Sequence, residues 1–206
     1  MRLPEGAFST REGNVIRLDA LLDEAEERAR AVVAESSPDL PEEQQVEIAR
    51  MVGIGAVKYA DLSQNPQSAV TFTWEKALAL NGNSAPYLQY ACARISSVLD
   101  KYAEQHPSTE LSEYPVVLGE SVERALAVHL LRFAGIVVQA GETFRPNVLA
   151  EYLYELAGMY SSFYQNVPFL RADEGVRESR VRICGVVACV LRRGLSLLGI
   201  ETPARI

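Results

Sequence analysis

Apolar residues recur at intervals of three and four positions through most of this chain, which is the spacing that places them on one face of an α-helix. The first such segment begins after Asp19, a plausible N-cap, and ends before the break at 36–39. A second segment begins near Pro41 and continues to about Leu62. Because the residues between the two segments are typical helix breakers, the pattern predicts two helices joined by a short turn.

Two glycines, Gly53 and Gly55, lie inside the second predicted helix. Glycine in a helix interior costs about 1 kcal/mol relative to alanine. We therefore expect another element to pack closely against this stretch. Beyond it, the alternation over 70–74 predicts a short extended piece, and residues 75–80 predict one or two helical turns.

The remainder of the chain also has helical spacing. The pattern predicts four further helices, over 87–105, 118–133, 146–165 and 176–198. A polar linker over 107–115 follows the first of them, and Gly199 is a natural C-cap for the last. Turn signals over 6–17 predict a short N-terminal loop or hairpin. The predicted fold class is all-α, a helical bundle preceded by this loop or hairpin.

Composition places the chain among ordinary globular proteins. Its 206 residues are 48% hydrophobic and 23% charged, which allows a sizeable buried core. The longest candidate for a membrane span, 134–140, is far shorter than the roughly 18 apolar residues that a span needs. The first six residues lack the apolar region of a secretory signal. We therefore expect no membrane partner and a cytoplasmic location.

Three cysteines, Cys92, Cys184 and Cys189, have no spacing typical of metal ligands, and only two histidines accompany them. Each cysteine lies in an apolar helical pattern, which predicts buried free thiols in a reducing compartment. We expect no metal site, because a zinc site needs several suitably spaced cysteine or histidine ligands.

The net charge of −7 argues against indiscriminate nucleic-acid binding. The charge is uneven along the chain, however. Residues 19–47 hold ten acidic and two basic residues, whereas residues 177–193 hold five arginines and one glutamate. A cationic last helix can attract phosphate groups locally, and it can equally be a solvated helix face.

The most informative stretch covers residues 83–97. Pro86 suits the first turn of a helix, where its missing N–H costs nothing. Tyr87, Tyr90 and Arg94 then lie three and four residues apart, so we expect them to share one helix face. Two rings beside a guanidinium suit the stacking of an unpaired nucleic-acid base. The alternative is an amphipathic helix whose tyrosines only cover the core.

Three separated blocks together resemble the C-terminal part of a class I arginyl-tRNA synthetase. Residues 8–25 are similar to the KMSKS-type signature loop of that family and the helix after it. Residues 52–90 form the second block. The third joins 152–156, 163–164 and 195–206, and it is similar to the helical anticodon-binding domain named for its D-A-L-R sequence. The likeness spans nearly the whole chain and keeps the family's order and spacing.

The resemblance implies a division of the chain into three parts. Residues 1–17 would be a remnant of the catalytic domain with its KMSKS-type loop, 18–82 a helical connecting region that contacts the tRNA stem, and 83–206 a DALR-type anticodon-binding domain. It also implies tRNA-Arg as the partner, with no role for DNA. In the full enzyme, an arginine–tRNA ligase, this portion supports the ATP-dependent attachment of arginine to tRNA.

The catalytic residues that the resemblance implies are Ser9, Thr10 and Arg11, in the loop that closes over the ATP phosphates in the full enzyme, with Mg. Both lysines of the motif are missing, since Ala7 and Thr10 stand in their places. An inert surface loop is the alternative.

The sequence contains no HIGH motif in the expected context and no pattern of a nucleotide-binding parallel sheet. We therefore expect a fragment or split product that depends on a missing catalytic domain. By itself it is expected to hold no cofactor and to have no ligase activity.

The resemblance and the helix pattern together imply a set of tRNA contacts at one pocket. They are Tyr87, Tyr90, Arg94, Tyr164, Arg180 and Ile206. The alternative for each tyrosine is burial in the core. The alternative for Arg180 is a structural ion pair with an acid such as Glu151 or Glu155.

Two other functions remain open on the sequence alone. The chain could be a stand-alone RNA-binding or protein-interaction module without catalysis. It could also be a helical scaffold with no RNA role, which the negative net charge allows.

Overall fold

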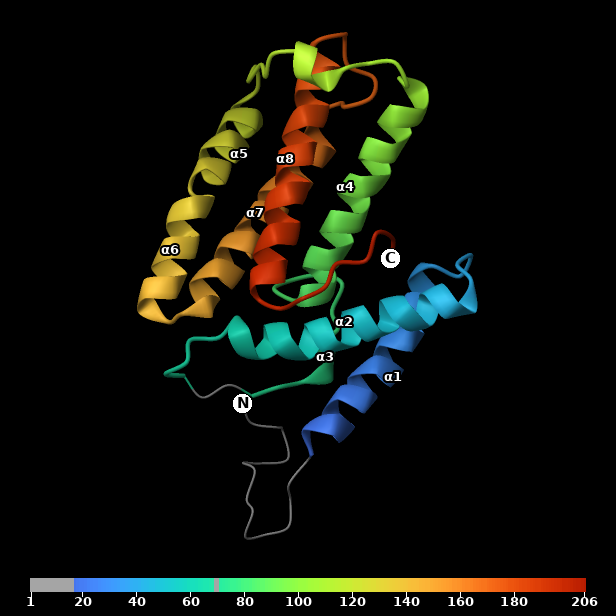
Figure 1. The fold of residues 1–206 in the computed structure, drawn as a ribbon, viewed down its shortest axis with the longest axis vertical. Coiled ribbons are helices and arrows are strands. Elements are labelled where there is room, and N and C mark those ends of the chain that lie inside the picture. Colours follow the sequence, from blue (N-terminus) through green and yellow to red (C-terminus); the bar gives the residue numbers. More distant parts are fainter. Residues whose placement is uncertain (1–16, 69–70) are drawn as a thin grey trace.

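A computed structural model describes residues 17–68 and 71–206, and within these residues it contains α-helices and no β-strand (Figure 1). The helices are α1 (Leu18–Ser36), α2 (Glu42–Leu62), α3 (Trp74–Ala77), α4 (Ala85–Gln105), α5 (Ser121–Leu131), α6 (Phe133–Thr143), α7 (Pro146–Asn166) and α8 (Val176–Leu197), with a 3-10 turn at Leu111–Glu113. The all-α bundle predicted from the sequence is confirmed. The loop or hairpin predicted over 6–17 lies outside the described residues except for Arg17.

Helices α1 and α2 form an antiparallel hairpin that crosses the base of the main bundle (Figure 1). Ala25, Ala29 and Val33 of α1 are fully buried. They can approach α2 closely because Gly53 has no side chain: a Cβ built there would lie 2.6 Å from the carbonyl oxygen of Ala25. The close packing expected at Gly53 is therefore confirmed, as a contact between helix backbones.

The main bundle is built around α4, α7 and α8, which run alongside one another in Figure 1. Their inner faces carry fully buried side chains such as Leu88, Leu156, Phe163 and Leu191. Ser84 caps α4, because its hydroxyl accepts a hydrogen bond from the Tyr87 backbone N–H, at 3.3 Å. The packing of this core sets the position of α4 along α7, and therefore which residues of the two helices lie next to each other.

The helix predicted over 118–133 corresponds to α5, which begins later, at Ser121. The structure adds a helix that the sequence did not predict, α6, after a break at Arg132. In the sequence, Gly135 indicates the end of a helix. The destabilisation of α6 by this glycine is offset because neighbouring apolar side chains, including Phe133 and Ile136, pack against the bundle core. Phe144 adopts the left-handed region (φ 54°) and ends α6 shortly before Pro146.

The prediction that all three cysteines are buried is wrong for one of them. Cys92 and Cys184 are buried, whereas Cys189 is exposed on the outer side of α8. The error arises because Cys189 directly follows the buried Ala188, and adjacent residues on a helix point in directions about 100° apart.

The chain after α8 lies across the bundle instead of projecting from it. Gly199, in the left-handed region (φ 69°), ends α8 as expected. Ile200 is then only 3% exposed. We call residues 199–206 the C-terminal strap; in Figure 1 it passes from the base of α8 over the lower end of α4, above α2.

None of the helices in the described ranges, 17–68 and 71–206, combines the length and the apolar character that crossing a bilayer requires.

Replacing Gly53 with alanine is expected to destabilise the fold by about 1–3 kcal/mol, because the new methyl group would overlap the α1 backbone. Urea unfolding monitored by circular dichroism measures this change. The control is Gly135→Ala, where no atom lies within 4 Å of the added Cβ. That substitution is expected to stabilise α6 by about 0.5–1 kcal/mol. Equal stability of the two variants would contradict the proposed backbone contact.

Iodoacetamide is expected to label the native chain at Cys189 alone. Burial raises the pKa of the Cys92 and Cys184 thiols to about 12, so neither forms the reactive thiolate near neutral pH. Mass spectrometry should find one modified site in the native chain and three after denaturation. A Cys189→Ser variant should then show no rapid labelling, and fast modification of Cys92 would contradict the described packing.

Candidate nucleic-acid interface

A groove of about 1070 Å³ opens where four separate parts of the chain meet. The α1–α2 turn forms one wall through residues 36–40, and α4 forms another between Tyr90 and Lys101. The end of α7 and the loop after it contribute residues 164–171. Arg205 and Ile206, from the C-terminal strap, complete the lining. No single stretch of sequence therefore carries this site.

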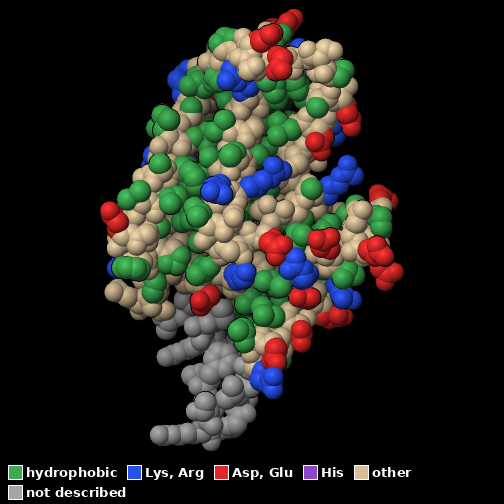
Figure 2. Space-filling model, viewed as in Figure 1, with side chains coloured by type: hydrophobic (Ala, Val, Ile, Leu, Met, Phe, Trp, Pro, Cys, Tyr) green, Lys and Arg blue, Asp and Glu red, His purple; other side chains and the backbone are tan. Residues whose placement is uncertain are grey.

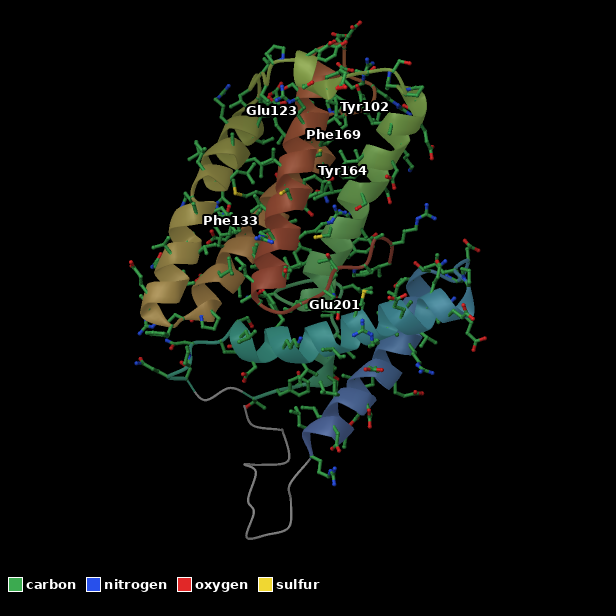
Figure 3. The ribbon with its side chains drawn as sticks, viewed as in Figure 1. Tyr102, Glu123, Phe133, Tyr164, Phe169 and Glu201 are labelled. Carbon is green, nitrogen blue, oxygen red and sulfur yellow. The ribbon has the colours of Figure 1, made fainter. Side chains whose placement is uncertain are left out.

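At the centre of the groove, one guanidinium lies between two tyrosine rings. The Cζ atom of Arg94 is 4.8 Å from the centroid of the Tyr90 ring and 5.6 Å from that of Tyr164. Tyr164 is 40% exposed, and its ring rests against Phe169, with centroids 5.7 Å apart (Figure 3). Two contacts of this kind hold Arg94 in place, and Tyr164 remains partly exposed to solvent.

The groove is positively charged although the chain is negatively charged. Its lining includes Arg94, Lys101, Arg171 and Arg205, with Asp39 as the acidic side chain. Acidic side chains gather instead at the lower right of Figure 2, over α1 and α2. This separation allows the groove to attract phosphate groups without making the whole surface cationic.

Tyr87 does not line this groove. It is half-buried in the first turn of α4, and its ring packs edge-on against Tyr154 of α7, with centroids 5.8 Å apart. The sequence predicted one face carrying Tyr87, Tyr90 and Arg94, and the structure brings only the last two of these to the groove. The reason is tertiary: α7 lies along α4 and supplies a partner for Tyr87 that helical spacing does not reveal.

Arg180 is buried, with 7% of its surface exposed, and its guanidinium makes two hydrogen bonds within the protein. Its Nε donates to a carboxylate oxygen of Glu123 at 2.7 Å, and its Nη1 donates to the carbonyl oxygen of Pro168, also at 2.7 Å. The ion-pair alternative is therefore observed, but with Glu123 of α5 rather than Glu151 or Glu155. Arg180 does not line the groove, but it supports the groove wall through its hydrogen bond to Pro168, which does.

Two other arginines near the ends of α8 are also engaged. Arg177 pairs with the buried Glu178 at 2.8 Å, and Arg192 donates to the hydroxyl of Ser96. Burial opposes the ionisation of Glu178, but hydrogen bonds from Gly175 N–H and Arg177 outweigh it, so the pKa of Glu178 is lowered. The basic segment predicted over 177–193 is thus largely a set of intramolecular contacts.

Ile206 has two environments. It lines the groove, and it also packs against a buried cluster between α1 and α2 that includes Val33, Ile48 and Val52. The apolar contact expected of this residue is therefore made at least in part within the protein.

Several groove residues were missed by the sequence reasoning. They are Asp39, Lys101, Phe169, Arg171 and Arg205. Lys101 lies seven residues after Arg94, two helical turns along the same face, so helical spacing could have found it. The others lie in loops or in the strap, and no periodic signal marks them.

The predicted catalytic residues Ser9, Thr10 and Arg11 lie outside the described residues. Among residues 17–68 and 71–206, no group of three or more histidine, cysteine or acidic side chains is arranged to hold a metal ion.

Two parts of the chain match known protein families. Residues 88–206, which contain most of α4 and all of α7, α8 and the strap, match the family described as the DALR anticodon binding domain. The chain belongs to that family. Residues 4–74 in addition match the catalytic domain of class I tRNA synthetases of the arginine type.

Several relatives of this DALR domain protein are longer proteins, described as arginine–tRNA ligases. An arginine–tRNA ligase of Fusobacterium nucleatum is 48% identical over 97% of this chain, and one of Cellvibrio japonicus is 46% identical over 96%. This chain spans 35% and 34% of their lengths. The arginyl-tRNA synthetase of Thermus thermophilus has the same fold, with a TM-score of 0.87 and 34% identity over the whole of this chain and 34% of that one. The family predicted from the sequence is confirmed.

Replacing Arg180 with leucine is expected to destabilise the DALR domain by about 3–5 kcal/mol, because Glu123 would be left buried without its partner. Thermal and urea unfolding measure the loss. The double variant Glu123→Leu/Arg180→Leu should recover most of it, since apolar pairs replace buried ion pairs at little cost. As a control, the exposed Arg193→Ala should change stability by less than about 0.5 kcal/mol.

Proposed function

We propose that this chain is the tRNA-Arg anticodon-binding portion of an arginine–tRNA ligase, and that the groove holds the anticodon loop. The observation that carries the proposal is the exposed Tyr164 ring beside the Tyr90–Arg94 pair, in a groove lined by four cations. Unpaired bases of an RNA loop stack on aromatic and guanidinium planes, and cations attract the phosphates between them. Membership in the DALR family supports the same assignment.

Different groove residues have different tasks in this proposal. Tyr90 and Tyr164 provide stacking surfaces, with Arg94 placed to contact a base or a phosphate. Lys101, Arg171 and Arg205 attract the backbone of the loop. We assign Tyr87 and Arg180 to the support of the site, because each is committed to partners inside the protein.

The chemistry of the whole enzyme extends beyond this chain. The relatives are about three times as long, so arginine and ATP with Mg would be bound largely by the part that this chain does not span. Ser9, Thr10 and Arg11 are proposed to face the ATP phosphates in that context. The buried, unpaired thiols of Cys92 and Cys184 agree with a cytoplasmic location.

Tyr90→Ala and Tyr164→Ala are each expected to weaken the binding of tRNA-Arg about 5- to 150-fold, since each removes a stacking surface that contributes about 1–3 kcal/mol. Filter binding at fixed salt measures this effect. The control is Phe144→Ala, which removes an 85% exposed ring outside the groove. It should leave the affinity unchanged.

A tRNA-Arg with an altered anticodon provides the second half of the test. The native chain should bind it less tightly than tRNA-Arg. Equal affinity for the two RNAs would favour the stand-alone RNA-binding module, and unchanged affinity in both tyrosine variants would refute the groove as the binding site.

A further inference from the structure

The C-terminal strap has no helix or strand of its own, so its position depends on the side chains that hold it. It leaves α8 through a tight turn, in which the Ile200 N–H donates to the Leu195 carbonyl oxygen at 2.9 Å. The buried Ile200 side chain fixes the start of the strap in the bundle core. The residues that reach the groove, Arg205 and Ile206, come five and six positions later.

One buried amide connects the strap to two helices. The Gln89 side chain of α4 is fully buried, and its Nε2 donates to the Glu201 carbonyl oxygen at 2.7 Å and to the Met51 carbonyl oxygen at 3.1 Å. Gly55 provides the space for this bridge: a Cβ there would lie 3.0 Å from Gln89 Nε2 and 3.2 Å from Ile200 Cγ2. Gln89 therefore holds α2 and the strap at a fixed separation.

Charged side chains of α2 hold the same part of the strap from the outside. Arg50 makes two hydrogen bonds to the Glu201 carboxylate, at 3.1 and 3.0 Å (Figure 3 labels Glu201 on the strap above α2). Lys58 donates to the Gly199 carbonyl oxygen at 2.5 Å. The Arg50 guanidinium lowers the pKa of Glu201, so the pair stays ionised at neutral pH.

We propose that Gln89 and the Arg50–Glu201 pair are positioning residues for RNA binding: they hold the strap against α2 and thereby keep the Arg205 cation at the groove. None of the three lines the groove. Their effect on RNA is therefore indirect and passes through Arg205. This inference rests on the proposed function of the groove.

A double-mutant cycle separates positioning from ordinary stabilisation. In the native chain, Arg205→Ala should weaken tRNA-Arg binding about fivefold and reduce the slope of log affinity against log salt by about one, as expected for one lost phosphate contact. In a Glu201→Ala or Gln89→Leu background, Arg205→Ala should cause little further loss, because the cation is no longer held in place. A merely structural role would leave the Arg205 effect unchanged.

Two further variants sharpen the test. The exchange Arg50→Glu/Glu201→Arg should restore both the affinity and the salt slope that Glu201→Ala loses. The matched control is Glu24→Ala, which removes another partly exposed arginine–glutamate pair, Arg28–Glu24 on α1, away from the groove. It should bind tRNA-Arg as the native chain does.

The outcomes distinguish this inference from the proposed function. If Tyr90→Ala and Tyr164→Ala weaken binding while Arg205→Ala costs as much in the Glu201→Ala background as in the native chain, positioning by the strap is refuted and the groove stands. If neither tyrosine variant weakens binding, both proposals fail. If Gln89→Leu does not fold, the cycle built on the exposed Glu201 decides the question.

Discussion

The groove depends on one buried guanidinium. Arg180 of α8 has the Glu123 carboxylate on one side and the Pro168 carbonyl on the other, so it joins α8, α5 and the loop after α7 at a single point. A buried charge without partners is strongly unfavourable, and these two bonds therefore restrict where the loop can lie. This loop contributes Phe169 and Arg171 to the groove wall. The contacts of Arg180 therefore shape the groove although Arg180 does not line it.

Contacts within the protein also hold the aromatic residues and Arg94 in the groove. Tyr90 lies near the start of α4 and Tyr164 near the end of α7, and cation–π contacts with both rings hold Arg94 in place of a carboxylate partner. A carboxylate partner would have cancelled the positive charge locally, whereas a ring leaves it available to a phosphate. The chain has a net charge of −7, and the aromatic partners of Arg94 explain how the groove remains positively charged.

Much of the fold follows from sequence periodicity alone. The long helices, the hairpin contact at Gly53 and the cap at Gly199 each have a local signal, and the family resemblance is the source of the ligand class that we propose. Two of the errors have a common cause in tertiary packing. The helix after Arg132 forms because the bundle core covers Phe133 and Ile136, and Tyr87 turns away because α7 offers Tyr154. Arg205 was missed because a strap without periodicity gives no indication of where it lies.

The assembly of the groove from distant segments limits how the domain can be exchanged between proteins. Residues 88–206 carry the α4, α7 and strap portions, but the wall at 36–40 and the strap's partner Arg50 lie outside that range. A chimera joined at residue 88 would combine a strap from one parent with an α2 from another. Recombination that preserves the groove should instead place its junction before α1, so that the hairpin and the bundle are inherited together.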